Sequence, residues 1–179
     1  MNKVWRLISK KSILDTPWLR INREECELPN GKIIDDFYTV WQPDWVLILA
    51  RTKEGKWLVE SQYRHGTQKI SLEFPAGIIN ATETPMDAAK RELQEECAYA
   101  EGEWTYLGEY PMNPDRNRGR YFVVFADGVV ESGQTNLDAT EEIDVMLLSS
   151  LELENKIISG EINHPHQLPA FYLWRLKYL

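Results

Sequence analysis

Up to about residue 148, this chain shows strand patterns interrupted by a single amphipathic helix pattern. This order of predicted elements constrains the fold more than any other feature of the sequence. The pattern begins near Pro85, which suits the first position of a helix, and Thr82 or Thr84 can cap it. The apolar residues that recur at helical spacing, and so predict the buried face, are Met86, Ala89, Leu93 and Cys97. A single helix among strands argues against a repeating βαβ fold and predicts an α+β domain with a mixed sheet.

Apolar runs bounded by turn residues predict the strands. The first forty residues have strand character, with alternation over 18–24, a hairpin turn at 29–31 and a return strand over 32–40. Later strands are predicted over 45–51, 57–64, 70–74, 104–110, 120–126 and 143–148, and two further helices over 149–158 and 168–179. We therefore expect a β-strand region of residues 1–42, followed by the main domain of residues 43–179.

The composition is that of a soluble globular protein with an acidic balance. The 179 residues carry a net charge of −8, which disfavours binding to nucleic acid or to anionic membranes. Two cysteines, Cys26 and Cys97, are too few for a disulfide framework. No segment has the apolar core of a signal peptide or the length of a membrane span. We expect a cytoplasmic protein with no nucleic-acid partner and no membrane partner.

The acidic residues gather in two segments, 77–101 and 121–155, and the second holds eight acids and no base. In the first, Glu92, Glu95 and Glu96 stand at i, i+3 and i+4, so the predicted helix places them on one face. Like charges at this spacing destabilise a helix unless a cation binds them, and rigid carboxylates suit Mg²⁺ or Mn²⁺. The alternative is an ordinary solvated face of a helix.

These glutamates belong to a longer pattern, G-x5-E-x7-R-E-u-x-E-E with u aliphatic, which resembles the Nudix hydrolase box. Its fixed positions are Gly77, Glu83, Arg91, Glu92, Glu95 and Glu96. Residues 62–66 and 72–77, with Pro114 sixteen residues beyond Ala98, are similar to the ADP-ribose pyrophosphatase branch of this family. The resemblance covers nearly the whole chain. It implies an α/β/α sandwich with a mixed sheet, preceded by N-terminal antiparallel strands.

The sequence departs from the box at Ala98, where the family pattern has a glycine that ends the helix. Two outcomes stay open at this position. Either Ala98 adopts the left-handed conformation, at a cost of about 1 kcal/mol, or the helix continues toward Gly102.

The resemblance implies roles for the residues in and next to the box. Glu92 and Glu96 are expected to bind Mg²⁺ or Mn²⁺. Glu95 is expected to act as a third ligand and to take part in catalysis, and the carbonyl oxygen of Ala76 is expected to add a backbone ligand. The residues expected to shape the motif are Gly77, Glu83 and Arg91.

The base that activates water is expected outside the box, because this branch carries it on a loop after the later strands. Here that loop is 136–142, and Glu141 or Glu142 fits, immediately before the strand over 143–148. We favour Glu141. For each glutamate the alternative is a solvated loop acid with no role in catalysis.

Arginines are the expected clamp for a diphosphate, because a guanidinium can donate two parallel hydrogen bonds to it. The candidates are Arg64, after the Gln-Tyr pair that precedes the box, and Arg116, Arg118 and Arg120 close to Pro114. Pairing with acidic residues is the alternative. The resemblance implies that the N-terminal strands hold the base and form a homodimer. Candidate platforms for the base are Trp18, Phe37, Trp41 and Trp45, although a tryptophan in a strand more often packs in a core.

The resemblance implies metal-dependent hydrolysis of ADP-ribose, or of a related nucleoside diphosphate sugar, to a nucleoside monophosphate and a sugar phosphate. One alternative is a hydrolase of another nucleoside diphosphate derivative, such as GDP-mannose. A second is a non-catalytic Nudix-fold module that binds ADP-ribose, although such a module has no need of a complete metal site. A third, a structural acidic domain, leaves the box and Pro114 unexplained.

Overall fold

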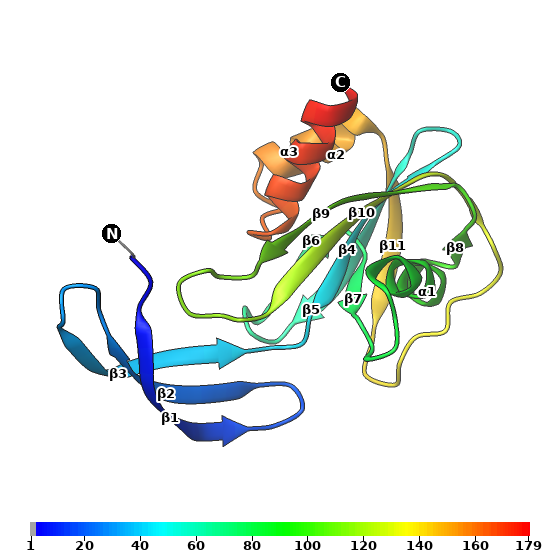
Figure 1. Cartoon of the computed structure of the whole chain (residues 1–179). Helices are drawn as coiled ribbons and strands as arrows, with labels where there is room; N and C mark the ends of the chain where they lie inside the picture. The colour runs from blue at the N-terminus through cyan, green and yellow to red at the C-terminus, as the bar shows by residue number, and fades with distance from the viewer. Residues whose placement is uncertain (1–2) are drawn as a thin grey trace. The chain divides into compact units, whose positions relative to one another are not determined.

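The computed structural model describes residues 3–179, which form two compact units (Figure 1). One unit contains the chain up to residue 44 together with residues 110–121, and the other contains residues 45–109 and 122–179. Residues 110–121 join the N-terminal segment through long-range contacts that no local pattern indicates. The expected division of function between residues 1–42 and 43–179 stays a prediction.

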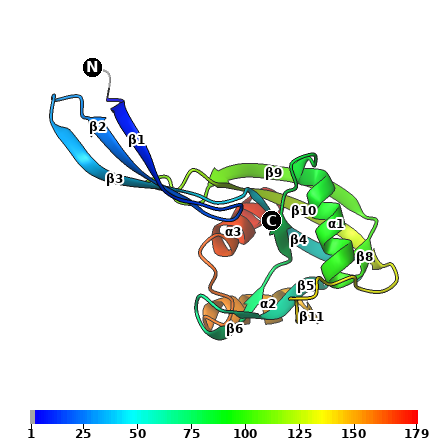
Figure 2. The same ribbon diagram turned by 90° about the horizontal axis from the view of Figure 1, so that it is seen from below.

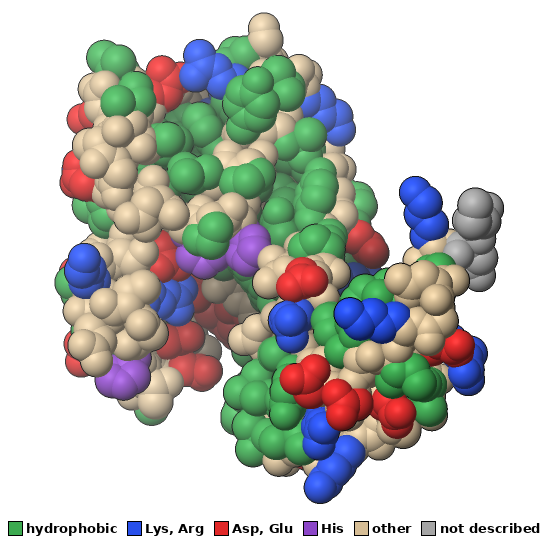
Figure 3. Space-filling model, turned by 90° about the vertical axis from the view of Figure 1, so that its left-hand side faces the viewer, with side chains coloured by type: hydrophobic (Ala, Val, Ile, Leu, Met, Phe, Trp, Pro, Cys, Tyr) green, Lys and Arg blue, Asp and Glu red, His purple; other side chains and the backbone are tan. Residues whose placement is uncertain are grey.

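The N-terminal unit is built on a three-stranded antiparallel sheet in the order β1-β2-β3. Its strands are β1 (Arg6–Asp15), β2 (Arg20–Glu27) and β3 (Ile33–Trp41). The turn between β2 and β3 uses Gly31 at φ +80°, a conformation that glycine adopts without strain. Several large apolar side chains of this unit are exposed: Trp5, Leu7, Ile13, Trp18 and Ile33. Figure 3 shows hydrophobic side chains, coloured green, on the surface of the protein.

The larger unit is organised by a sheet in the order β11-β5-β4-β10-β8, with β6 on β5, β7 on β4 and β9 on β10. The strands are β4 (Trp45–Thr52), β5 (Trp57–Arg64), β6 (Lys69–Glu73), β7 (Ala76–Ile78), β8 (Tyr99–Ala100), β9 (Glu103–Pro111), β10 (Arg120–Glu131) and β11 (Ile143–Leu148). The sequence patterns do not predict β7 and β8. Both are very short, and β7 is extended because it pairs with residues 45–47 of β4.

Helices cover both faces of the sheet of the larger unit. Residues of the central strands point alternately to either side, so both faces carry apolar side chains that a helix can bury. Val46 and Ile48 of β4 pack with α1 (Pro85–Cys97) in one apolar cluster. On the other face, Trp57 of β5 contacts Trp174 of α3 (Gln167–Tyr178), with ring centroids 4.5 Å apart. Figures 1 and 2 show α1 and α3 on opposite sides of β4 and β10. Between β11 and α3 lies α2 (Ser150–Ile158). Across residues 3–179, no helix has both the length and the apolar character needed to cross a membrane.

The main helix begins where the sequence predicts. Thr84 is the N-cap, its hydroxyl accepts a hydrogen bond from the Asp87 backbone N–H, and Pro85 occupies the first helical position. The helix ends at Cys97, and Ala98 adopts the left-handed conformation with φ 58° and ψ 35°. Of the two outcomes that the sequence left open, the first is therefore correct.

Replacing Ala98 by glycine should stabilise the protein by about 0.5–1 kcal/mol, because glycine adopts this conformation without the steric penalty of a Cβ atom. The expected rise in melting temperature is roughly 1–4 °C, measured by differential scanning calorimetry. Ala88→Gly, inside α1, is the matched control and should lower the melting temperature. A lower melting temperature for Ala98→Gly would contradict the prediction.

Candidate active site

The loop that precedes α1 can approach the helix closely because residue 77 is a glycine. A Cβ atom on Gly77 would lie 2.0 Å from the carboxylate carbon of Glu92, so the Glu92 side chain would have to move from its position. Gly77 is in β7, which is paired with β4, so the strand cannot simply move away. The glycine of the box therefore lets the backbone of residues 76–78 pack against the carboxylate of Glu92 where that carboxylate now lies.

Arg91 ties the box together. Its Nε lies 2.6 Å from Glu83 Oε1, and its Nη2 donates to Glu83 Oε2 and to the carbonyl oxygen of Ile78, both at 3.0 Å. Its Nη1 lies 2.9 Å from a carboxylate oxygen of Glu92 and 2.9 Å from one of Glu95. Arg91 thus braces the loop against the helix through Glu83 and Ile78, and it also reaches Glu92 and Glu95.

The glutamates of α1 do not form an ordinary solvated face. Glu92 is 9% exposed and Glu96 is 5% exposed, although Glu95 is half-buried. The Oε2 atom of Glu96 is buried and has no hydrogen-bond partner among residues 3–179. A buried carboxylate oxygen without a donor is costly, so this atom marks a place where a cation or a proton is needed.

The pKa shifts in the cluster also indicate that it needs a cation or a proton. Burial raises the pKa of Glu96 to about 10, and the negative charges of Glu60, Glu92 and Glu141 add to this effect. Burial also raises the pKa of Glu92, against the opposing influence of Arg91, and Glu141 again acts in the upward direction. The three carboxylates of Glu92, Glu96 and Glu141 are therefore close enough to repel one another.

The loop between β10 and β11 brings Glu141 to this cluster. The Asn136 backbone N–H donates to the carbonyl oxygen of Glu95, 2.8 Å away, which attaches the loop to α1. Glu141 is half-buried, and its Oε2 accepts a hydrogen bond of 2.9 Å from the Asp138 backbone N–H. Its neighbour Glu142 is exposed, and it is not among the charges that shift the pKa of Glu96.

The sequence patterns do not single out Glu60, which the structure adds to the cluster. It lies in β5, is 3% exposed, and accepts a hydrogen bond of 3.1 Å from the thiol of Cys97. Burial raises the pKa of Glu60 to about 7. The sequence feature that could have identified Glu60 is its position directly after the apolar run 57–59, where an acidic residue is unusual. Cys97 itself is buried against the core, as expected.

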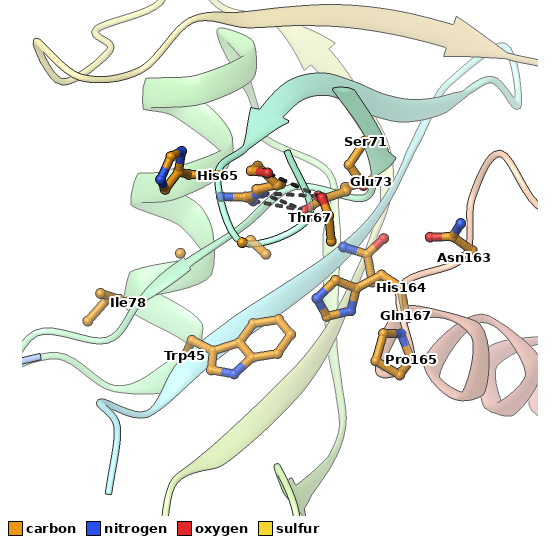
Figure 4. Close-up of a pocket in the computed structure, with 14 residues that line it drawn as sticks. Trp45, His65, Thr67, Ser71, Glu73, Ile78, Asn163, His164, Pro165 and Gln167 are labelled. Atoms are coloured by element: carbon orange, nitrogen blue, oxygen red, sulfur yellow. Dashed lines mark hydrogen bonds and ion pairs between the residues drawn. The ribbon is translucent and has the colours of Figure 1, made fainter. Parts of the chain in front are cut away.

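Arg64 lies at the end of β5, between two cavities. Its guanidinium forms three hydrogen bonds of 2.8–3.2 Å with the carboxylate of Glu73, which is buried (Figure 4). One cavity, of about 520 Å³, extends from Arg64 to residues 139–142 and so includes Glu141. The other, also about 520 Å³, extends from Arg64 to Trp45, Ala76 and Gly77. Arg64 can therefore reach ligands on either side.

The other predicted substrate residues lie in the N-terminal unit. Arg118 donates to the carboxylate of Glu24 at 2.8 and 3.0 Å, and Arg116 stacks over the ring of Phe37. Trp41 is covered by a guanidinium 4.2 Å from its ring centroid, and Pro114 is exposed in a turn. Arg120 pairs with Asp44. Arg118 and Arg120 thus each pair with an acid that precedes them in the chain.

The residues present fit a hard divalent cation, although within residues 3–179 no three His, Cys, Asp or Glu side chains converge at metal-ligand spacing. Arg91 Nη1 contacts one carboxylate oxygen each of Glu92 and Glu95, which occupies part of their capacity to bind a cation. The orphaned Glu96 oxygen, the mutual repulsion of the carboxylates and the all-oxygen donor set are the properties of a Mg²⁺ or Mn²⁺ site.

Comparison with known proteins adds independent information. Residues 41–171 match the family model described as NUDIX domain, and residues 5–40 match the model described as nucleoside diphosphate sugar hydrolase N-terminal domain. The chain is 31% identical over 173 residues to an ADP-ribose pyrophosphatase of Bacillus subtilis, covering 96% of this chain and 93% of the relative. It is 28% identical over 145 residues to a methanol dehydrogenase activator of Bacillus methanolicus, covering 80% of this chain and 78% of the relative.

A solved structure supports the fold. A crystal structure of an ADP compounds hydrolase superposes with a TM-score of 0.84, at 19% sequence identity, over 96% of this chain and 92% of that chain. At this low identity the likeness concerns the fold alone. It confirms the predicted fold class, a mixed-sheet α/β/α sandwich preceded by N-terminal antiparallel strands.

Proposed function

Because this chain belongs to the Nudix hydrolase family, we propose that it hydrolyses the diphosphate of ADP-ribose, or of a related nucleoside diphosphate sugar, to a nucleoside monophosphate and a sugar phosphate. The observation that carries the proposal is the buried carboxylate cluster around Glu96, whose Oε2 has no hydrogen-bond partner within residues 3–179. The match of residues 5–40 to the N-terminal domain of nucleoside diphosphate sugar hydrolases supports the substrate class.

The proposed cofactor is Mg²⁺ or Mn²⁺. Glu92 and Glu96 would hold it, with Glu95 and the carbonyl oxygen of Ala76 as further ligands. When bound, such a cation offsets the charge of the diphosphate and lowers the pKa of a coordinated water. The chain's own contribution is to hold these oxygens in place, since Arg91 fixes the carboxylates and Gly77 lets the Ala76 backbone approach them.

Glu141 is the proposed base that accepts a proton from the attacking water, with Glu142 as the other candidate. Its position supports this role, because its carboxylate acts on the pKa of both Glu92 and Glu96 and is oriented by the Asp138 N–H. Arg64 is the proposed diphosphate clamp in the larger unit. In the N-terminal unit, Arg116, Arg118, Pro114 and Trp41 stay candidates for substrate binding.

We further propose that the protein is a cytoplasmic homodimer whose interface includes the N-terminal sheet. The exposed apolar side chains on β1 and β3 support this, because removing such side chains from water under a partner subunit is favourable. The two cysteines, both free and buried, are compatible with a reducing compartment.

The proposal is tested by measuring phosphate release, with added phosphatase, from a panel of nucleoside diphosphate sugars in Mg²⁺ and in Mn²⁺. We expect turnover of ADP-ribose or of a close analogue, and none after chelation of the metal. Preferred turnover of GDP-mannose would move the assignment to another nucleoside diphosphate derivative. Binding of ADP-ribose without turnover of any member of the panel would favour a binding module and overturn the proposal.

A further inference from the structure

The cavity beside Ala76 and Gly77 has walls from four parts of the larger unit. Trp45 comes from the start of β4, and Thr67 and Ser71 come from the β5–β6 turn and β6. Residues 163–165 come from the segment between α2 and α3. A cavity of about 520 Å³ lies within the range of small-molecule sites in proteins.

This cavity adjoins the carboxylate cluster, because Gly77 belongs to both. Its Cα hydrogens face the cluster so closely that an added Cβ would meet the Glu92 carboxylate, and the same residue lines the cavity. Arg64, on the other side, also lines the cavity. A diphosphate bound between Arg64 and the box would therefore have one of its two substituents next to this cavity.

The wall that faces the box is held rigidly by Gln167, which is 1% exposed. Its Oε1 accepts a hydrogen bond of 2.8 Å from the Phe74 backbone N–H, and its Nε2 donates to the Phe74 carbonyl oxygen at 3.3 Å. Phe74 lies two residues before Ala76. The segment that carries His164 is thus fixed to the strand that leads into the box, so the cavity is formed before a ligand binds.

The chemistry of the walls suits a sugar better than a nucleobase. The rings of Trp45 and His164, which line the cavity, contact each other and the neighbouring ring of His166 at tilted or perpendicular angles, with centroids 5.4–5.9 Å apart, so they leave no slot between parallel faces for a base. Figure 4 shows Trp45 and His164 at one end of the cavity, with Thr67, Ser71 and Asn163 around it. Hydroxyl and amide groups donate and accept, as sugar hydroxyls require.

The imidazole of His164 adds to this match. Burial lowers the pKa of His164, and Arg64 acts in the same direction against the influence of Glu73. This shift favours the neutral ring, which offers one donor and one acceptor nitrogen. A neutral polyhydroxyl ring is a suitable partner for such a group.

We infer that this cavity binds the sugar of the nucleoside diphosphate sugar, and that Trp45 and residues 163–165 select which sugar is accepted. The inference rests on the proposed function, because it assigns one end of that substrate. It adds residues from the α2–α3 segment, more than a hundred positions beyond the β4 tryptophan, to the substrate site.

The test compares kcat/KM of the wild-type protein and of His164→Ala on three substrates in Mg²⁺. ADP-ribose and ADP-glucose share the base and differ in the sugar, whereas ADP-glucose and GDP-glucose share the sugar and differ in the base. We expect the ADP-ribose to ADP-glucose ratio to change by about 10-fold or more, and the ratio between the two glucose substrates to stay within about twofold. A change in the base ratio instead would place the nucleobase in the cavity and overturn the inference.

Matched amides provide the control. Asn163→Ala, in the cavity wall, should alter the sugar ratio, and Asn155→Ala, on the exposed surface of α2, should leave it unchanged. Trp45→Phe, which keeps an aromatic ring at the start of β4, should also alter the sugar ratio. An unchanged sugar ratio in His164→Ala, Asn163→Ala and Trp45→Phe, with normal turnover, would refute the sugar site while leaving the proposed function intact.

Measurements of equilibrium binding test the sugar site separately from the proposed hydrolase function. Isothermal titration with ribose 5-phosphate and, separately, with AMP needs no turnover. His164→Ala should weaken the binding of ribose 5-phosphate about 10-fold and change that of AMP by less than twofold. If the wild-type protein hydrolyses none of the substrates, the proposed function fails, and this measurement still decides whether the cavity binds the sugar end. Equal affinity of wild type and variant for ribose 5-phosphate would overturn the inference.

Discussion

Replacing Glu96 by glutamine is expected to lower kcat by at least about 1000-fold while the fold is kept. Glutamine has nearly the same shape but carries no negative charge, so it would remove an anionic oxygen from the proposed cation site. A 1000-fold loss corresponds to about 4 kcal/mol of transition-state stabilisation. The measurement is turnover of ADP-ribose in saturating Mg²⁺, together with the melting temperature of the same preparation.

The same variant should change the pH dependence of stability in the metal-free protein. The pKa of Glu96 is about 10 in the folded state and near 4.5 in an exposed glutamate, so the folded state binds the proton more tightly. This contribution is fully present below about pH 4.5 and is lost as the pH rises toward 10. In EDTA, wild type should therefore lose stability between pH 6 and pH 9, and Glu96→Gln should lose less.

Two controls make this result specific. Glu103→Gln changes an exposed glutamate at the start of β9 and should leave turnover, Mn²⁺ affinity and the pH profile unchanged. Titration of Mn²⁺, followed by its electron paramagnetic resonance signal, should show weaker binding to Glu96→Gln than to wild type. Near-normal turnover of Glu96→Gln would refute the assignment of the metal site.

Features encoded by neighbouring residues could be predicted from the sequence. The start of α1 depends on Thr84, Pro85 and Asp87, which stand within four positions of one another, and the helix begins there. The strand predicted over 143–148 is found over those residues, since its pattern of apolar residues is local. The box likewise occupies one loop and one helix, so its internal arrangement follows from spacing.

Features that depend on distant parts of the chain could not be predicted in this way. Glu60 reaches the cluster only because β5 lies under α1, where Cys97 contacts it. Trp45 and His164 are separated by more than a hundred positions, and only packing of the α2–α3 segment against the sheet brings their rings to 5.9 Å. Such contacts depend on tertiary structure, which residue patterns in one sequence do not specify.

The pairing of the arginines shows the same limit. The sequence identifies Arg118 as a cation near Pro114 but not its partner, Glu24, which lies 94 positions away on β2. The hydroxyl of Thr39 donates to the same carboxylate at 2.9 Å, and this bond with the Arg118 pair offsets the cost of burying Glu24. In the N-terminal unit, Arg118 therefore has a structural role in addition to any contact with substrate.

Glu141→Gln is expected to lower kcat by about 10²–10⁴-fold, the usual contribution of a general base, and Glu142→Gln should change it by no more than a few-fold. The reason is geometric. Glu141 is half-buried, its carboxylate is oriented by the Asp138 N–H, and its charge raises the pKa of Glu96, whereas Glu142 is exposed.

The two glutamates form a matched pair, because they have the same side chain, stand next to each other and lie on the same loop. A difference between the two variants therefore cannot come from the loss of a charge in this segment alone. The pH profile of kcat supplies a second readout, since loss of a general base should remove the acidic limb in Glu141→Gln and leave it in Glu142→Gln. Equal and mild effects of both substitutions would mean that the base lies elsewhere, and a large effect confined to Glu142→Gln would transfer the role to that residue.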